Sequence, residues 1–215
     1  NGTIAHPKFI VLLGDLSAHL AFFSNSVLKN EAIVFKMLKI QFPDIPIFYI
    51  FGNNDSLKGN YGPFKDSEHR NQVQSPYQIA QSEGGWLNGF LSTGIHCEDK
   101  QNNFPCLLSE NSDSGYYSAY LATQLRLIAL NSVLFSPKRT ITTAQEALTQ
   151  LQWLEAQLKT AKSKQESVLI TMHIPPGNNI YDHNNFWLPN EQAIFLKIVK
   201  TYQQTIIGLI AGHTH

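Results

Sequence analysis

Residues 8–15 read KFIVLLGD, and this stretch decides the fold class. Residues 8–13 are a short apolar, β-branched run, which predicts a strand buried on both faces. Gly14 and Asp15 follow directly, so an acidic side chain stands where the predicted strand ends.

The same order of apolar strand and polar turn recurs three times further along the chain. Residues 45–51 (IPIFYIF) precede Gly52-Asn53-Asn54-Asp55, residues 167–172 (SVLITM) precede His173, and residues 205–211 (TIIGLIA) precede Gly212-His213-Thr214-His215. In open α/β sheets, ligands bind beyond the carboxyl ends of the strands. The four turns therefore predict one shared site.

Helical patterns separate these strands. Apolar residues recur near the helical period over 26–42, 143–162 and 191–202, and residues 74–91 are predicted to be partly helical. Thr143 and Glu146 fit a capping box, and residues 116–121 and 125–130 predict a β-hairpin after a polar stretch, 96–114, interpreted as a loop. This alternation predicts an α/β domain whose sheet is mainly parallel at its centre.

The composition excludes several classes of protein. The 215 residues carry 16 basic and 16 acidic side chains, and charged residues make up only 15%. This balance argues against a nucleic-acid-binding patch, and a hydrophobic content of 43% argues against disorder. No apolar run approaches the ~20 residues of a transmembrane segment. We therefore expect a globular protein.

The two cysteines, Cys97 and Cys106, lie nine positions apart in the polar stretch. Their spacing allows a disulfide, which would suit an oxidising compartment, but two thiols leave both the bonded and the free state open.

The predicted site has the chemistry of metal ligands. A carboxylate can bridge two cations, an amide oxygen suits a hard ion, and imidazole suits zinc, iron or manganese. Taken singly, each feature also fits an ordinary turn or a hydrogen-bonded core histidine. Their occurrence directly after four strands favours a metal site with these ligands: Asp15, Asn53, His173, His213 and His215.

The ordered motifs GD (14–15), GNND (52–55), the histidine of MHIPPG (172–177) and GHTH (212–215) resemble those of the calcineurin-like metallophosphoesterases. GDxxxH (14–19), HxPPG (173–177) and the QLQWLEAQL segment (150–158) resemble the acid-sphingomyelinase-like branch. The resemblance, which spans 9–215, implies a four-layer α/β/β/α sandwich with two divalent metals at one edge. Zinc is the expected metal, with manganese or iron as alternatives.

The resemblance also implies a role for each ligand. Asp15 would bridge the two metals, Asn53, His173 and His213 would complete one of them, and His215 would bind the other. The expected reaction is attack of a metal-bound hydroxide on a phosphoester phosphorus. The substrate would be a phosphoester small molecule or a lipid headgroup. Because relatives are mostly exported, the resemblance also implies a secreted, periplasmic or lysosome-like location.

The sequence departs from the family pattern at both ends. The family's first Asp-x-His motif is missing before Asp15, and relatives continue past His215. We therefore expect residues 1–215 to be a single metallophosphoesterase domain that is incomplete at both ends. The oligomeric state is left open.

A third departure is Asn54, which stands where most relatives have a catalytic histidine. Asparagine cannot act as an acid, although its amide can donate to a phosphoryl oxygen. His19, the histidine of GDxxxH, is the replacement general acid that the branch resemblance implies, and Asp55 takes an orienting role. A surface histidine is the alternative interpretation of His19.

Polar residues that follow His173 are candidates for the substrate groove or for an ordinary polar loop: Asn178, Asn179, Tyr181 and His183. Tyr61 and the Lys58-Gly59-Asn60 turn are candidates to contact a phosphate. The sequence therefore predicts an acid-sphingomyelinase-like metallophosphodiesterase. An endopolyphosphatase-like hydrolase and a non-hydrolytic phosphate-binding module are the alternatives.

Overall fold

The computed structural model describes residues 7–16, 24–43, 45–56, 59–64, 77–78, 97, 105–139 and 144–214. His19, His215, Thr143 and most of the helix expected over 74–91 lie outside the described residues.

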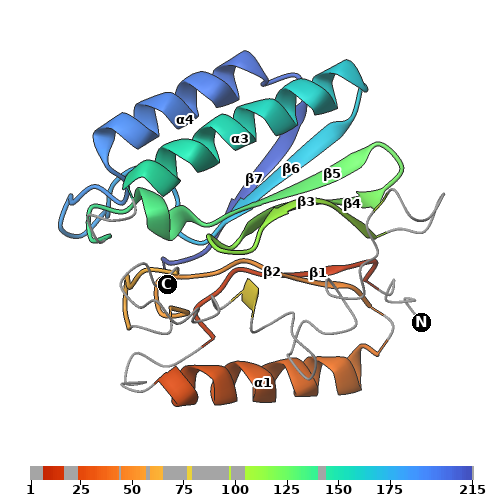
Figure 1. The fold of residues 1–215 in the computed structure, drawn as a ribbon, viewed down its shortest axis with the longest axis vertical. Coiled ribbons are helices and arrows are strands. Elements are labelled where there is room, and N and C mark those ends of the chain that lie inside the picture. Colours follow the sequence, from red (N-terminus) through yellow and green to blue (C-terminus); the bar gives the residue numbers. More distant parts are fainter. Residues whose placement is uncertain are drawn as a thin grey trace.

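The described elements form four layers (Figure 1). Helix α1 (Ser24–Gln41) covers a small sheet of β1 (Ile10–Leu12) and β2 (Ile47–Tyr49). A larger sheet follows, made of β3 (Cys106–Asn111), β4 (Tyr116–Ala122), β5 (Leu125–Leu130), β6 (Ser167–Met172) and β7 (Ile206–Ala211). Helices α3 (Ala144–Ser163) and α4 (Pro189–Thr201) cover its other face, so the predicted α/β/β/α sandwich is confirmed.

At strand β5 the pairing in the larger sheet changes from antiparallel to parallel. This strand pairs antiparallel with β4, as the predicted hairpin requires, and parallel with β6, which in turn pairs parallel with β7. The small sheet is also parallel, with Ile10 opposite Ile47. Because parallel strands end at the same edge, this topology brings the polar turns after β1 and β2, and those after β6 and β7, to common edges.

Two hydrophobic cores hold the layers together, and β5 contributes to both. Ile128 and Leu130 belong to the core under α3 and α4, whereas Leu127 and Ala129 belong to the core that includes β2 and α1. This alternation of faces is the strand period of two, and it explains the continuous apolar run of β5.

Helix α3 packs on the larger sheet through one apolar face with the helical period. Its buried residues recur every three or four positions and face the larger sheet: Ala147, Gln150, Leu151, Leu154, Leu158 and Ala161. No described helix is long and apolar enough to cross a membrane.

Two features of the fold differ from the sequence interpretation. Residues 106–111, interpreted as loop, form β3, an edge strand whose Ser109, Glu110 and Asn111 interrupt the apolar alternation. Strand β1 is only partly buried rather than buried on both faces. The open question of the cysteines is answered, because Cys97 and Cys106 form a disulfide at the start of β3.

Candidate metal centre

Four strand ends deliver side chains to one place. Asp15 follows β1 and Asn53 follows β2 in the small sheet, while His173 follows β6 and His213 follows β7 in the larger one. Ligand-type atoms of Asp15, His173 and His213 all lie within 4.8 Å of one another. The structure thus brings together four of the five predicted ligands, and the fifth, His215, is outside the described residues.

His173 lies at the centre of this group. Its Nδ1 contacts the carbonyl oxygen of Leu13, so the neutral ring carries its proton there and presents Nε2 as a lone pair. That Nε2 lies 3.1 Å from Asp15 Oδ2, 3.2 Å from Asn53 Oδ1 and 3.2 Å from His213 Nδ1. A lone pair that faces two oxygen acceptors needs a proton or a cation between them.

Asn53 is oriented to present oxygen rather than nitrogen to this centre. Its Nδ2 donates to Asn60 Oδ1 at 2.8 Å, which leaves Oδ1 directed at His173. One carboxylate, one amide oxygen and two imidazoles are a donor set that suits zinc, manganese or iron, so the residues present fit a divalent metal.

Electrostatics couple Asp15 and His173 in the absence of an ion. Burial lowers the pKa of His173, but the hydrogen bond and charge of Asp15 outweigh burial and raise it above its ordinary value. Burial raises the pKa of Asp15, but His173 and the amide donors of Asn54 outweigh burial and lower it. The two groups therefore favour the charged pair, in which the proton occupies the place of a cation.

Glycine is required at two positions beside Asp15: Gly52 makes room for its carboxylate, and Gly14 lets the chain after β1 approach the end of β2. A Cβ on Gly52 would lie 2.2 Å from Asp15 Oδ1, and a Cβ on Gly14 would lie 2.5 Å from the carbonyl oxygen of Ile50. Asp15 and His213 themselves have positive φ angles of 56° and 72°. Non-glycine residues rarely adopt this conformation, and its occurrence at two converging ligands fits a functional site.

Asp55 ties the two turns of the small sheet together. Its Oδ2 accepts hydrogen bonds from the backbone N–H of Asp15 at 3.0 Å, from that of Gly52 at 2.7 Å and from the Tyr49 hydroxyl at 2.8 Å. Asp55 therefore lies behind the ligands and fixes the backbone that carries them.

Asn54 faces Asp15 instead of solvent. Its backbone N–H donates to Asp15 Oδ1 at 2.8 Å, and its Nδ2 donates to Asp15 Oδ2 at 2.9 Å. The side chain that replaces the usual histidine thus places an amide donor beside the centre.

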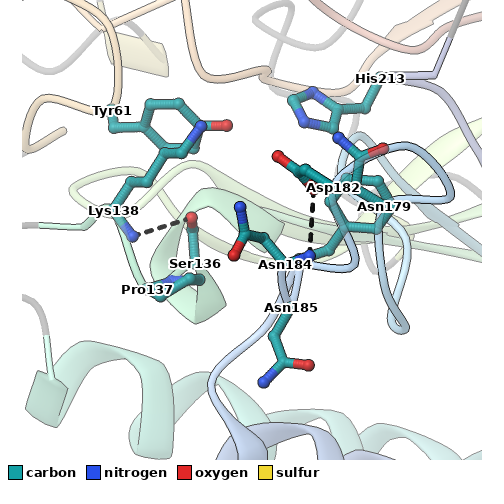
Figure 2. A pocket seen from close by; sticks show the side chains of 10 residues that line it. Tyr61, Ser136, Pro137, Lys138, Asn179, Asp182, Asn184, Asn185 and His213 are labelled. Carbon is teal, nitrogen blue, oxygen red and sulfur yellow. Dashed lines mark hydrogen bonds between the residues drawn. The ribbon is translucent and has the colours of Figure 1, made fainter.

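A cavity of about 350 Å³ opens beside His213 (Figure 2). Figure 2 shows Tyr61 and Lys138 on one side and Asn179, Asp182 and His213 on the other. Lys138 Nζ lies 5.1 Å from the centre of the Tyr61 ring, a cation–π contact. An adjoining cavity of about 360 Å³ is also lined by His213.

Most of the loop residues that the sequence suggested as candidates line these two cavities. Tyr61, Asn178, Asn179 and Tyr181 line one or both, whereas His183 lines neither.

Sequence reasoning missed Lys138 as a lining residue, because the loop after Phe135 carries no motif that points to the site. Asp182 was missed as well, although the neighbouring Tyr181 was a candidate. It also missed the role of Asn60, which shows only as a contact to Asn53 in space.

Comparison with known proteins agrees with this geometry. The profile of the family described as calcineurin-like phosphoesterase matches residues 3–215. Sphingomyelinase phosphodiesterase C of Dictyostelium discoideum is 32% identical over 222 residues, covering 97% of this chain and 43% of the relative. The human acid sphingomyelinase-like phosphodiesterase 3b is 27% identical, with 97% of this chain and 43% of the relative covered. An endopolyphosphatase of Cryptococcus neoformans is 24% identical over 194 residues, covering 86% of this chain and 24% of the relative.

The chain thus spans less than half the length of these relatives. The family uses divalent metals, and the donor set at the sheet edge suits them. With the fold, the motif order and the matched profile in agreement, the chain belongs to the calcineurin-like phosphoesterase family, in its acid-sphingomyelinase-like branch.

Proposed function

We propose that this protein is a metal-dependent hydrolase that cleaves a phosphodiester or related phosphoester. The observation that carries the proposal is the convergence of Asp15, Asn53, His173 and His213 on one point from four strand ends. Two divalent ions, with zinc preferred, would occupy this edge, where they would activate a water molecule as nucleophile and neutralise charge on the phosphoryl oxygens.

The proposed role of each ligand is the one that the family resemblance implies, and the positions of the described ligands support it. Asp15 offers two carboxylate oxygens and lies between the two sheets, so it would bridge the ions. Asn53, His173 and His213 would hold one ion, and His215, the partner that the family resemblance implies, would bind the other. Contact with the Leu13 carbonyl fixes the His173 tautomer, which keeps Nε2 free to ligate.

Proton transfer to the leaving group is assigned to His19, because Asn54 has no titratable proton. The Asn54 amide already donates to an oxygen anion, that of Asp15. When an ion binds Asp15, the same Nδ2 would donate to a phosphoryl oxygen instead, which would stabilise charge without acid catalysis.

The cavity beside His213 would receive the part of the substrate that extends beyond the scissile phosphate. Its lining combines one ammonium group, one carboxylate, amides and aromatic rings. The names of the relatives suggest sphingomyelin as a substrate, and that of the endopolyphosphatase suggests a phosphoanhydride. We propose the phosphodiester first and the phosphoanhydride as the alternative, with which Asn54 in place of the usual histidine is compatible.

The disulfide between Cys97 and Cys106 supports a proposed location in an oxidising compartment, either secreted, periplasmic or lysosome-like.

The test is metal content and hydrolysis of bis(p-nitrophenyl) phosphate by the full-length parent protein, beside the variant Asp15→Asn. We expect two metals per chain and turnover in the parent, with loss of both in the variant. A parent protein without metal or turnover would overturn the proposal. Metal binding without turnover of phosphodiester, sphingomyelin or polyphosphate would instead indicate the non-hydrolytic phosphate-binding module.

A further inference from the structure

A second acidic side chain lies buried behind the candidate centre. Glu31 projects from α1 and is 1% exposed, and neither of its carboxylate oxygens has a hydrogen-bond partner in the described part of the chain. An acidic residue on an outer helix normally faces solvent, so burial without a partner calls for a physical reason.

Its neighbour is Asp55. Glu31 and Asp55 lie within hydrogen-bonding reach of each other, and Asp55 is 0% exposed. Asp55 Oδ2 has its three donors, whereas Asp55 Oδ1 is buried and without a partner among the described residues. Two carboxylates both without protons would repel each other here, in a place that water does not reach.

A single proton on Glu31 pairs one of its oxygens with Asp55 Oδ1 and removes the repulsion between the two carboxylates. The carboxylic acid then donates to Asp55 Oδ1, and Asp55 remains the acceptor of its three other donors. Burial, followed by the charge of Asp55, raises the pKa of Glu31 well above its ordinary value, in agreement with this state.

We propose that Glu31 is a positioning residue: as a neutral acid it donates a fourth hydrogen bond to Asp55 and so fixes the turns that carry Asp15 and Asn53. The chain of contacts is short. Glu31 holds Asp55, Asp55 Oδ2 holds the backbone N–H groups of Asp15 and Gly52, and these turns set the ligands. The effect on metal affinity and turnover rests on the proposed function, whereas the proton on Glu31 does not.

The experiment compares Glu31→Gln and Glu31→Leu in the full-length protein. Glutamine is neutral, similar in shape and keeps a donor for Asp55, whereas leucine fills the space without one. Leu38→Ala is the matched control, because Leu38 lies on the same helix, packs against the core that includes β2 and has an apolar side chain that can donate no hydrogen bond to Asp55. Zinc affinity, kcat and KM are measured for each, with thermal unfolding as the check on folding.

We expect Glu31→Gln to keep zinc affinity and kcat within about threefold, and Glu31→Leu to lose about 10- to 100-fold in both, as for other residues that orient metal ligands. Equal losses in the glutamine and leucine variants, or no loss in either, would overturn the proposal. So would an equal loss in Leu38→Ala, which would assign the effect to general destabilisation.

An infrared measurement keeps this test separate from that of the proposed function. At neutral pH, the wild type should show the carbonyl band of a buried protonated carboxylic acid, and Glu31→Gln should lack it. Absence of the band from the wild type would overturn the proposal even if the protein hydrolyses phosphodiesters. A protein that shows the band but neither binds zinc nor turns over would instead contradict the proposed function.

Discussion

His173 Nε2 and Asp15 Oδ2 lie 3.1 Å apart, although the two residues end strands in different sheets of the sandwich. The imidazole is 3% exposed and the carboxylate is 20% exposed, so solvent screens the pair only in part. The contact therefore joins the two sheets electrostatically as well as placing two predicted ligands side by side.

The pair predicts how the stability of the metal-free protein depends on pH. The raised pKa of His173 gives stability that is complete below its unfolded value of 6.5 and is lost as pH rises through the folded value. The lowered pKa of Asp15 gives stability that is present above its unfolded value of 3.8 and is lost as pH falls through the folded value. The contribution should be greatest between these unfolded values.

Urea unfolding in the presence of a chelator checks this prediction. The difference in free energy of unfolding between wild type and His173→Gln should be larger at about pH 5 than at about pH 9. A difference that does not change with pH would show that the pair is not ionised in the folded protein.

Replacing the Asp15 carboxylate, which we propose bridges the metals, should weaken metal binding strongly. Asp15→Asn removes the negative charge but keeps the size of the side chain, and we expect a loss of about 100-fold or more in metal affinity and kcat/KM, because residues that only orient ligands already cost 10- to 100-fold. Glu155→Gln, an exposed carboxylate change on α3, is the control and should leave both quantities unchanged. Metal affinity is measured by competition with a coloured chelator.

Gly52→Ala should act on Asp15 through space. The added Cβ would meet Asp15 Oδ1 at 2.2 Å, so the carboxylate or the turn must move. We expect metal affinity to fall at least about tenfold, since a ligand displaced by about 1 Å loses its geometry. Gly59→Ala is the control: its φ of +97° costs stability, but its Cβ would meet nothing within 4 Å, and metal affinity should be retained.

Replacing Lys138 should affect KM for highly charged substrates more than KM for a simple phosphodiester. The ammonium group of Lys138 lines the cavity beside His213, so it would attract a leaving group that carries further negative charge. Lys138→Met is expected to raise KM about tenfold for a phosphoanhydride and to change KM little for bis(p-nitrophenyl) phosphate, with kcat preserved for both. A uniform change in KM would place the substrate elsewhere.

The disulfide should affect stability and leave the chemistry intact. Cys97 and Cys106 are nine positions apart, and closing so short a loop lowers the entropy of the unfolded chain enough to contribute about 2–3 kcal/mol. The double variant Cys97→Ser/Cys106→Ser should unfold at lower urea concentration, with kcat unchanged under conditions where it is folded. An unchanged unfolding midpoint would contradict this prediction.

The strands that carry the site were predictable because their sequence signals are local. The strand predicted over 167–172 coincides with β6, where an apolar run stops abruptly at His173. The helix predicted over 143–162 nearly coincides with α3 for the same kind of reason, a clear apolar period. Both signals depend only on neighbouring residues.

What escaped prediction depends on distant contacts. Strand β3 is defined by its partner β4 rather than by its own polar residues, and the pairing shifts register between Leu107 and Ser109. Lys138 reaches the cavity only because the loop after Phe135 lies against the loop of Asn179 and Asp182. Glu31 has the polarity of a surface residue, and its burial depends on contacts of the folded chain that the local sequence does not signal.

The division of the ligands between two sheets has a consequence for biosynthesis. Among the described strands, β1 and β2 pair only with each other, so the small sheet meets the larger one through side chains rather than through a shared backbone ladder. A newly made chain whose halves have not yet docked would hold Asp15 and Asn53 apart from His173 and His213. The proposed metal site would therefore form only after the two sheets have docked, so binding of the ion would report correct assembly of the chain.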